Sequence, residues 1–215
     1  MNFIGHLLVA SWQRDDPAFG LGAMLPDFAS MARMRPPRVD HAAVAEGMVL
    51  HQRTDDVFHA CPGFVALSGS VFEALLGDGV ERGPARAVAH IGVELLIDGA
   101  LLAHEPALGP AYLSALAAFE GLPATALAEA DAIRLRALHA RLRQHGIPYD
   151  YESPELVTAR LISILGPRPR LCLSAHAATR VGRIMPDLKG RVVARLSELL
   201  SSLAHGLSHP RYSPS

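Results

Sequence analysis

Apolar residues recur at every third or fourth position through most of this chain. Such spacing is typical of amphipathic helices. It predicts a first helix around Phe3–Ala10, a second from about Asp40 to His59, and further helices near residues 63–77, 84–104, 107–119, 124–145, 153–165, 168–183 and 187–204. Alternating apolar and polar runs joined by hairpin turns are absent from the sequence. We therefore predict an all-α fold, a single-domain helical bundle over residues 1–207.

Glycine and proline mark the predicted breaks between these helices. The stretch DDPAFGLGAMLPDF (15–28) predicts a loop, RMRPPR (33–38) a second break, and CPG (61–63) the end of the helix that precedes it. The final segment SHPRYSPS (208–215) predicts a disordered tail.

Composition narrows the classes of protein to be considered. The apolar half of the chain is mostly Ala and Leu, which favours helix over sheet. A formal net charge of -1 gives no indication of a nucleic-acid or membrane-surface partner. Cys61 and Cys172 lack metal-site spacing and fit a reducing compartment, although a single bridge is still allowed.

The apolar start has no basic segment before it, and no apolar run is long enough to span a membrane, so we expect a cytoplasmic protein.

Two polar residues interrupt the apolar stripe of the helix over 40–59. His51 and Asp55 step with Val44, Met48 and Phe58 along one face, which places them one turn apart and facing inward. A buried carboxylate requires a cation or hydrogen-bond donors. A simple His–Asp pair at the helix end, or an exposed last turn, would satisfy the same pattern.

The helix over 84–104 is apolar on every side, as expected of a central core helix. Its interior carries Glu94 and Asp98, one turn apart, and two like charges at this spacing repel each other. Burial strengthens the repulsion unless a cation holds them or one is protonated. Pairing with two buried arginines is the alternative.

Together the two helices offer His51, Asp55, Glu94 and Asp98 as ligands of one metal centre. Bundle-core metal sites are assembled in this way from facing helices. Imidazole with carboxylates suits manganese, iron or zinc. His6 and Asp27 could complete the shell, and weaker candidates are His90, His104 and His176.

Four short motifs resemble the acyl carrier protein phosphodiesterase family, also called acyl carrier protein hydrolases. They are MNFIGHL (1–7), GAMLPDF (22–28), HQRTDD (51–56) and RPRL (168–171), in the family's order. The resemblance implies an all-helical fold distantly related to the HD-domain metal phosphohydrolases. It implies hydrolysis of the phosphodiester that links 4′-phosphopantetheine to a serine of holo-acyl carrier protein, a step of lipid metabolism, with a divalent metal. Manganese is the metal expected, and Mg2+ or Fe2+ are alternatives.

The resemblance also implies roles for individual residues. Asp27, His51, Asp55, Glu94 and Asp98 would be metal ligands. His6 would be a further ligand, and either His6 or His51 could instead be the general acid. The residues expected to hold phosphate oxygens are Arg53, Arg168 and Arg170. The chain departs from the family where Gly99 replaces a His, where Glu94 replaces an Asp, and in having no His-Asp dipeptide.

An acyl carrier protein is acidic, so its recognition needs a local basic surface. The predicted helix over 124–145 supplies one, with Arg134, Arg136, Arg141 and Arg143; a solvated outer face balanced by upstream acids is the alternative. Two other functions fit the sequence: an HD-like metal phosphohydrolase acting on a nucleotide or small phosphoester, and a helical binding module without catalysis. The oligomeric state is not determined by the sequence.

Overall fold

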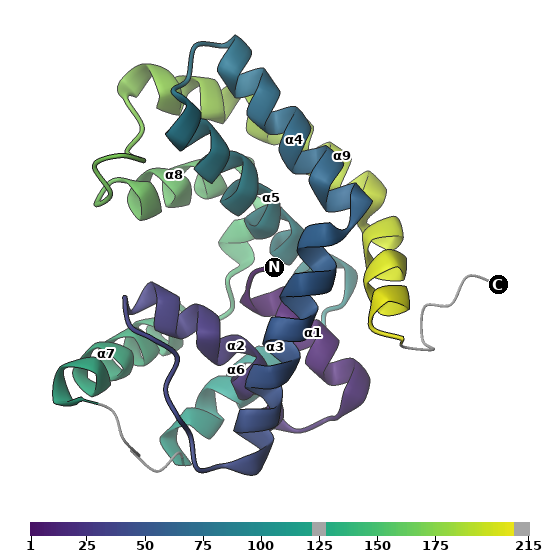
Figure 1. Cartoon of the computed structure of the whole chain (residues 1–215), viewed down its shortest axis with the longest axis vertical. Coiled ribbons are helices and arrows are strands. Elements are labelled where there is room, and N and C mark those ends of the chain that lie inside the picture. Colours follow the sequence, from purple (N-terminus) through teal and green to yellow (C-terminus); the bar gives the residue numbers. More distant parts are fainter. Residues whose placement is uncertain (122–127, 209–215) are drawn as a thin grey trace. The chain divides into compact units, whose positions relative to one another are not determined.

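The computed structural model describes residues 1–121 and 128–208 (Figure 1). Within these residues the chain forms nine α-helices, two short 3-10 helices and no strand, which confirms the all-α prediction. The segment 122–127 and the residues after 208 lie outside the description. The predicted tail therefore stays a prediction, as does the beginning of the helix predicted over 124–145.

The chain divides into two compact units, each built from two separate stretches. Unit 1 comprises Met1–Val57 and His104–Pro148, and unit 2 comprises Phe58–Ala103 and Tyr149–Ser215. Unit 1 holds α1 (Phe3–Gln13), α2 (Pro17–Met31), most of α3 (Ala42–Ala60), α6 (Leu108–Ala118), η1 (Phe119–Gly121) and α7 (Glu129–His145). Unit 2 holds the end of α3, α4 (Pro62–Gly77), α5 (Arg82–His104), η2 (Tyr149–Glu152), α8 (Pro154–Leu165) and α9 (Ala175–Gly206).

The core of unit 1 forms where α1, α2 and α6 pack on one another, with α7 against α2 and α6. Phe3 of α1 contacts Phe28 of α2 and Tyr112 of α6, with both ring centroids 5.7 Å away. All three rings are buried, so one aromatic cluster ties the three helices together.

The loop predicted over 15–28 is wrong, because most of this stretch is helix α2. Asp16 caps the helix by accepting a hydrogen bond from the Ala18 amide at 2.9 Å, and Pro17 occupies the first turn, where no amide hydrogen is needed. Gly22 serves a close helix contact, since a Cβ there would lie 2.2 Å from the Val44 carbonyl oxygen of α3. The glycine that suggested a turn instead lets two helices touch through their backbones.

Unit 2 packs α9 against α4 and α8, and α8 against η2. Gly92 of α5 lies against Met185 of α9 and Leu161 of α8. Most of α5 is buried, as its all-round apolar character predicts. Among the described residues, α5 is the one helix whose length and apolar composition would suffice to cross a membrane. α3 and α4 meet the same criteria only when they are counted together as one bent span.

The two helices predicted over 168–183 and 187–204 are one helix, α9, of 32 residues. Pro186 lies inside it on the exposed side, where the carbonyl that loses its partner faces water. A continuous buried stripe holds the helix together across the proline: Ala177, Val181, Met185, Leu188, Val192, Leu196, Leu199 and Leu203. Both cysteines are free, Cys61 buried and Cys172 exposed.

Candidate functional site in unit 1

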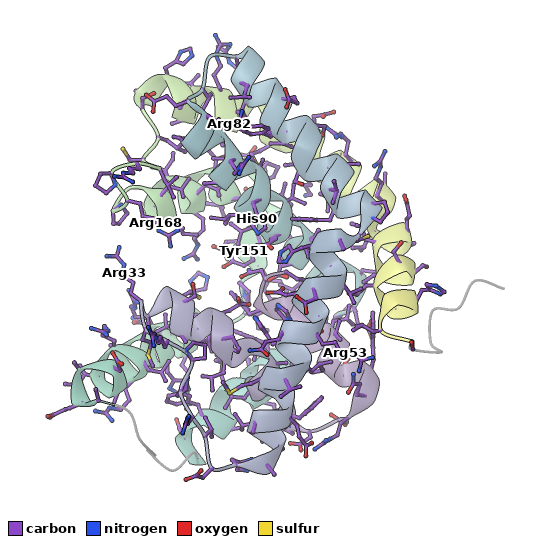
Figure 2. All side chains as sticks on the ribbon, viewed as in Figure 1. Arg33, Arg53, Arg82, His90, Tyr151 and Arg168 are labelled. Carbon is purple, nitrogen blue, oxygen red and sulfur yellow. The ribbon has the colours of Figure 1, made fainter. Side chains whose placement is uncertain are left out.

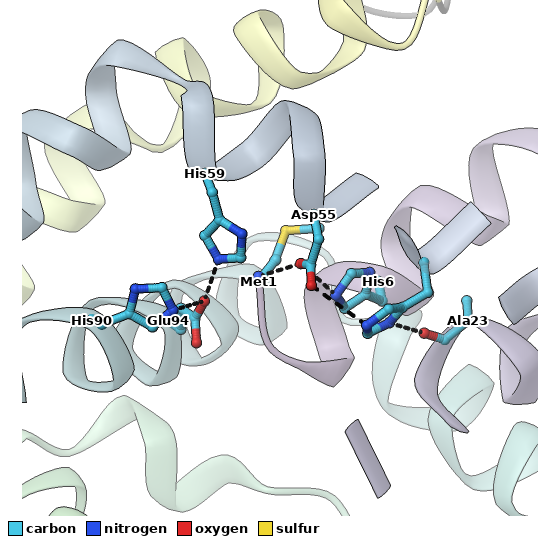
Figure 3. Close-up of polar contacts among 8 residues, drawn as sticks. Met1, His6, Ala23, Asp55, His59, His90 and Glu94 are labelled. Atoms are coloured by element: carbon cyan, nitrogen blue, oxygen red, sulfur yellow. Dashed lines mark hydrogen bonds and ion pairs between the residues drawn. The ribbon is translucent and has the colours of Figure 1, made fainter. Parts of the chain in front are cut away.

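His51 and Asp55 lie one turn apart on α3 and face the same group of polar side chains. The Nε2 atom of His51 is 3.5 Å from Oδ2 of Asp55. His6 of α1 places its Nε2 atom 3.2 Å from the other oxygen, Oδ1. The two imidazole rings stack with centroids 3.8 Å apart (Figure 3). Asp55 therefore connects two histidines that come from different helices.

The tautomer of His51 follows from its second contact. Nδ1 of His51 lies 2.8 Å from the carbonyl oxygen of Ala23 in α2. A carbonyl oxygen only accepts, so Nδ1 must carry the proton and donate it. A neutral His51 then aims the lone pair of Nε2 at the Asp55 carboxylate. A proton or a metal ion must lie between them, and metal-binding histidines are held by the same kind of outer hydrogen bond.

Asp27 joins the cluster because the predicted loop is a helix. It follows Ala23 by four residues on α2, so both lie on the face that meets His51. One donor atom each from His6, Asp27 and His51 lie within 4.8 Å of one another. We call His6, Asp27, His51 and Asp55 the α1–α3 cluster.

The electrostatics of the α1–α3 cluster leave His6 neutral and Asp55 charged. Burial, partly offset by the Asp55 hydrogen bond, lowers the pKa of His6 from 6.5 to about 4, so its imidazole is neutral near pH 7. Burial by itself would raise the pKa of Asp55, but the His6 contact and the Met1 ammonium, 2.7 Å away, lower it well below its usual range. The Asp55 side chain is 31% exposed, so the cluster can be reached from solvent.

The acidic pair of α5 lies in unit 2 and makes different contacts. Glu94 accepts from His59 of α3 at 3.1 Å and lies 3.2 Å from Nε2 of His90 (Figure 3). Asp98 is fully buried and has partners of its own. Glu94 therefore lies with two histidines of unit 2, which the spacing of the acidic pair along the helix does not reveal.

The two histidines beside Glu94 do not stand out in the sequence, where His59 lies just beyond the apolar stripe and His90 is only a weak candidate. A signal for both is nevertheless present, because His51, Asp55 and His59 follow one another at steps of four, as do His90 and Glu94. His59 is not selected because the apolar stripe of the helix ends at Phe58, the residue before it.

Gly99, where the resembled family has a histidine, is explained by packing within unit 2. A Cβ at this position would lie 2.2 Å from the carbonyl oxygen of Tyr151 and 2.8 Å from the Glu152 amide nitrogen. The backbone of η2 thus passes directly against α5, and no side chain fits. The glycine is a structural requirement here, so it does not by itself indicate a lost catalytic residue.

The predicted phosphate-binding arginines are all exposed. Arg53 lies on α3 (Figure 2). It follows His51 by two residues, and helix geometry turns it about 200° around the axis from His51. Arg168 and Arg170 lie in the turn between α8 and α9 in unit 2. Unit 1 also has a shallow hollow lined by Arg14, Asp16 and others, which contains none of the predicted site residues.

The arginines predicted to bind a partner lie on α7, and all four are exposed. Arg134 forms an ion pair with Asp131 one turn earlier, and Arg143 forms one with Glu120 of η1. The charge of these two is therefore partly neutralised within the unit.

No family model, curated protein or solved structure matches this chain.

Proposed function

We propose that the protein is a divalent-metal-dependent phosphodiesterase, with the α1–α3 cluster as its metal centre. The observation that carries the proposal is His51, whose Nδ1 is committed to the Ala23 carbonyl while Nε2 faces Asp55. Two imidazoles and two carboxylates form a donor set suited to manganese or iron. The Met1 ammonium, 2.7 Å from Asp55, supplies one positive charge, and a divalent ion would supply the rest for two carboxylates.

The chain's own residues would hold and orient the ion. His6, Asp27 and His51 each offer one donor atom within 4.8 Å of the others, and Asp55 bridges the two histidines. A bound divalent ion would supply Lewis acidity toward phosphoryl oxygens and make a water ligand acidic near neutral pH. His6 suits ligation better than general acid catalysis, because its low pKa leaves it unprotonated at neutral pH.

The substrate proposed is holo-acyl carrier protein, on the strength of the family resemblance. Water attacks phosphorus, the bond between phosphorus and the serine oxygen breaks, and a proton from water reaches that oxygen. The products are the serine hydroxyl and 4′-phosphopantetheine. Arg53 faces away from the α1–α3 cluster around α3, so it is not proposed as a phosphate ligand. For Arg168 and Arg170 this role stays a prediction from the resemblance alone.

Docking of an acidic carrier would rest mainly on Arg136 and Arg141 of α7. Arg134 and Arg143 are engaged by neighbouring carboxylates, which leaves less free charge than the sequence suggested. This reduced charge favours the second candidate function, hydrolysis of a nucleotide or other small phosphoester at the same centre.

The test is incubation of the purified protein with Mn2+ and holo-acyl carrier protein, followed by mass measurement of the carrier. Wild type should remove the phosphopantetheine group, and Asp27→Asn and His51→Ala should lose both manganese and turnover. His104→Ala is the matched control, because His104 is exposed and is not part of the α1–α3 cluster. Full turnover by Asp27→Asn would remove the α1–α3 cluster as the centre.

Charge reversal on α7 tests which of the two proposed substrates, the carrier protein or a small phosphoester, the enzyme uses. Arg136→Glu/Arg141→Glu should slow turnover of the carrier, most strongly at low salt, since rim charges act on association and are screened. Cleavage of a small phosphodiester should not change. Arg183→Glu/Arg195→Glu, the same charge change on exposed positions of α9, is the control. If the α7 variant keeps full activity on both substrates, the result would favour the small phosphoester as substrate.

A further inference from the structure

Unit 2 contains a second group of side chains able to bind a metal. The sequence pattern assigns Glu94 to a different ligand set, makes His90 a weak candidate and does not select His59. His59 comes from the last turn of α3, and His90 and Glu94 come from successive turns of α5. One donor atom from each lies within 4.8 Å of the others. We call these three residues the His59–His90–Glu94 group.

Both imidazoles converge on the same carboxylate oxygen. Nε2 of His59 is 3.1 Å and Nε2 of His90 is 3.2 Å from Oε1 of Glu94. The two rings stack with centroids 5.0 Å apart, at 26° to each other (Figure 3). Phe64 of α4 makes T-shaped contacts with both rings, with centroids 5.4 Å away. The histidines are therefore positioned by an apolar neighbour as well as by the carboxylate.

These distances match the separations between ligands of a zinc ion. Ligand atoms about 2.0–2.1 Å from a tetrahedral zinc lie about 3.3 Å from one another. Two histidines and one glutamate are a known zinc ligand set in sites that keep a fourth position open. Imidazole ligands also favour late first-row metals over Mg2+ or Ca2+.

The surroundings allow an ion to reach the group and to be held there. The side chains of His59 and His90 are 35% and 47% exposed, whereas that of Glu94 is 12% exposed. Burial by itself would raise the pKa of Glu94, but the contacts with His59 and His90 outweigh it and lower the pKa well below its usual range. A charged carboxylate thus lies at the base of the group, with the imidazoles on its solvent side.

We propose that His59, His90 and Glu94 bind a zinc ion, or a similar late first-row divalent cation, with one coordination position left to solvent. This site shares no residue with the manganese centre proposed for unit 1, and it does not depend on the proposed phosphodiesterase activity.

The test is a zinc titration of the full-length, chelator-stripped protein carrying Asp27→Asn, which disables the α1–α3 cluster. One zinc ion per chain should bind. In this background His59→Ala and His90→Ala should each weaken zinc binding by more than roughly 100-fold, since even loss of an outer-shell partner costs about 10- to 100-fold. Glu94→Gln should also weaken it, and His104→Ala, an exposed histidine on the same helix, should not.

Cobalt gives a second readout that identifies the ligands. Co2+ bound by two imidazoles and a carboxylate in a four-coordinate site should give strong visible absorption, lost in His59→Ala and in His90→Ala. Circular dichroism of each variant should match wild type, because both histidines are partly exposed and neither belongs to the apolar core.

Two outcomes would overturn the proposal. The first is failure of the Asp27→Asn protein to bind zinc at micromolar concentration. The second is unchanged zinc affinity in both histidine variants. Either outcome would mean that His59, Glu94 and His90 are only hydrogen-bonded to one another and do not bind a metal. Because binding is measured without turnover, loss of phosphodiesterase activity would neither mimic nor mask these results.

Discussion

Substitution of Gly99 by alanine adds one methyl group at the closest approach between α5 and η2. Its Cβ would lie 2.2 Å from the Tyr151 carbonyl oxygen and 2.4 Å from the carbonyl carbon. Real Cβ atoms do not come this close to other atoms, so something has to move. The obstacle is backbone, which cannot rotate away as a flexible side chain can.

The cost can be placed at the upper end of the range for overpacked cores. Extra methyl groups in a packed interior cost about 1–3 kcal/mol, and a backbone obstacle gives a value near 3 kcal/mol. The intrinsic helical preference for alanine over glycine, about 0.5–1 kcal/mol, works in the opposite direction and leaves a net loss of about 2 kcal/mol. For a chain of this size that loss lowers Tm by about 4–8 °C.

Urea and thermal unfolding followed by far-UV circular dichroism measure this effect. Gly69→Ala is the matched control, because Gly69 lies inside α4, is exposed, and would place its added methyl group in open space, with no atom within 4 Å. It should gain about 0.5–1 kcal/mol from helix propensity alone. If Gly99→Ala is as stable as wild type, the close approach of η2 to α5 is wrong. The structural explanation for the missing histidine then fails with it.

Two further predictions concern the α1–α3 cluster. Gly22→Ala should push α2 away from Val44 of α3, disturb the Ala23–His51 hydrogen bond and weaken Mn2+ binding by roughly 10- to 100-fold in a titration; Gly190→Ala, with open space around it, should bind as wild type does. In the metal-free protein the folded state disfavours protonation of His6, so the unfolded chain binds more protons between pH 4 and 6.5. The unfolding free energy should therefore fall by about 3 kcal/mol as the pH drops through that window; a His6→Gln variant with the same slope in urea melts would contradict this assignment.

The spacing of apolar residues was sufficient to predict most helices, because it reports which face of a helix is buried. It failed for α2, where Gly20, Gly22 and Pro26 suggested a loop. Local preference was overridden by packing, since Gly22 and Gly47 let α2 and α3 meet through their backbones. A single sequence does not distinguish a glycine needed for a turn from one needed for contact.

The sequence was sufficient to select residues of the candidate site, but not to predict their contacts. His6, Asp27, His51 and Asp55 could be selected because each is polar among apolar neighbours, and the structure brings all four together. The partner of a buried carboxylate, in contrast, depends on which helices meet. Glu94 has histidine neighbours from two helices, and one of them, His59, comes from a turn 35 residues away. Spacing along one helix cannot identify such a contact.

The two donor groups differ in a way that bears on what each can bind. Two carboxylates and two histidines, with His51 fixed by a backbone carbonyl, provide a harder environment that is richer in oxygen donors. The His59–His90–Glu94 group has one carboxylate and exposed imidazoles. Oxygen-rich sites favour manganese, and sites richer in imidazole favour zinc. A chain equilibrated with both ions should therefore take them up selectively, and the loss of one ion in Asp27→Asn and of the other in His90→Ala would assign each ion to its group.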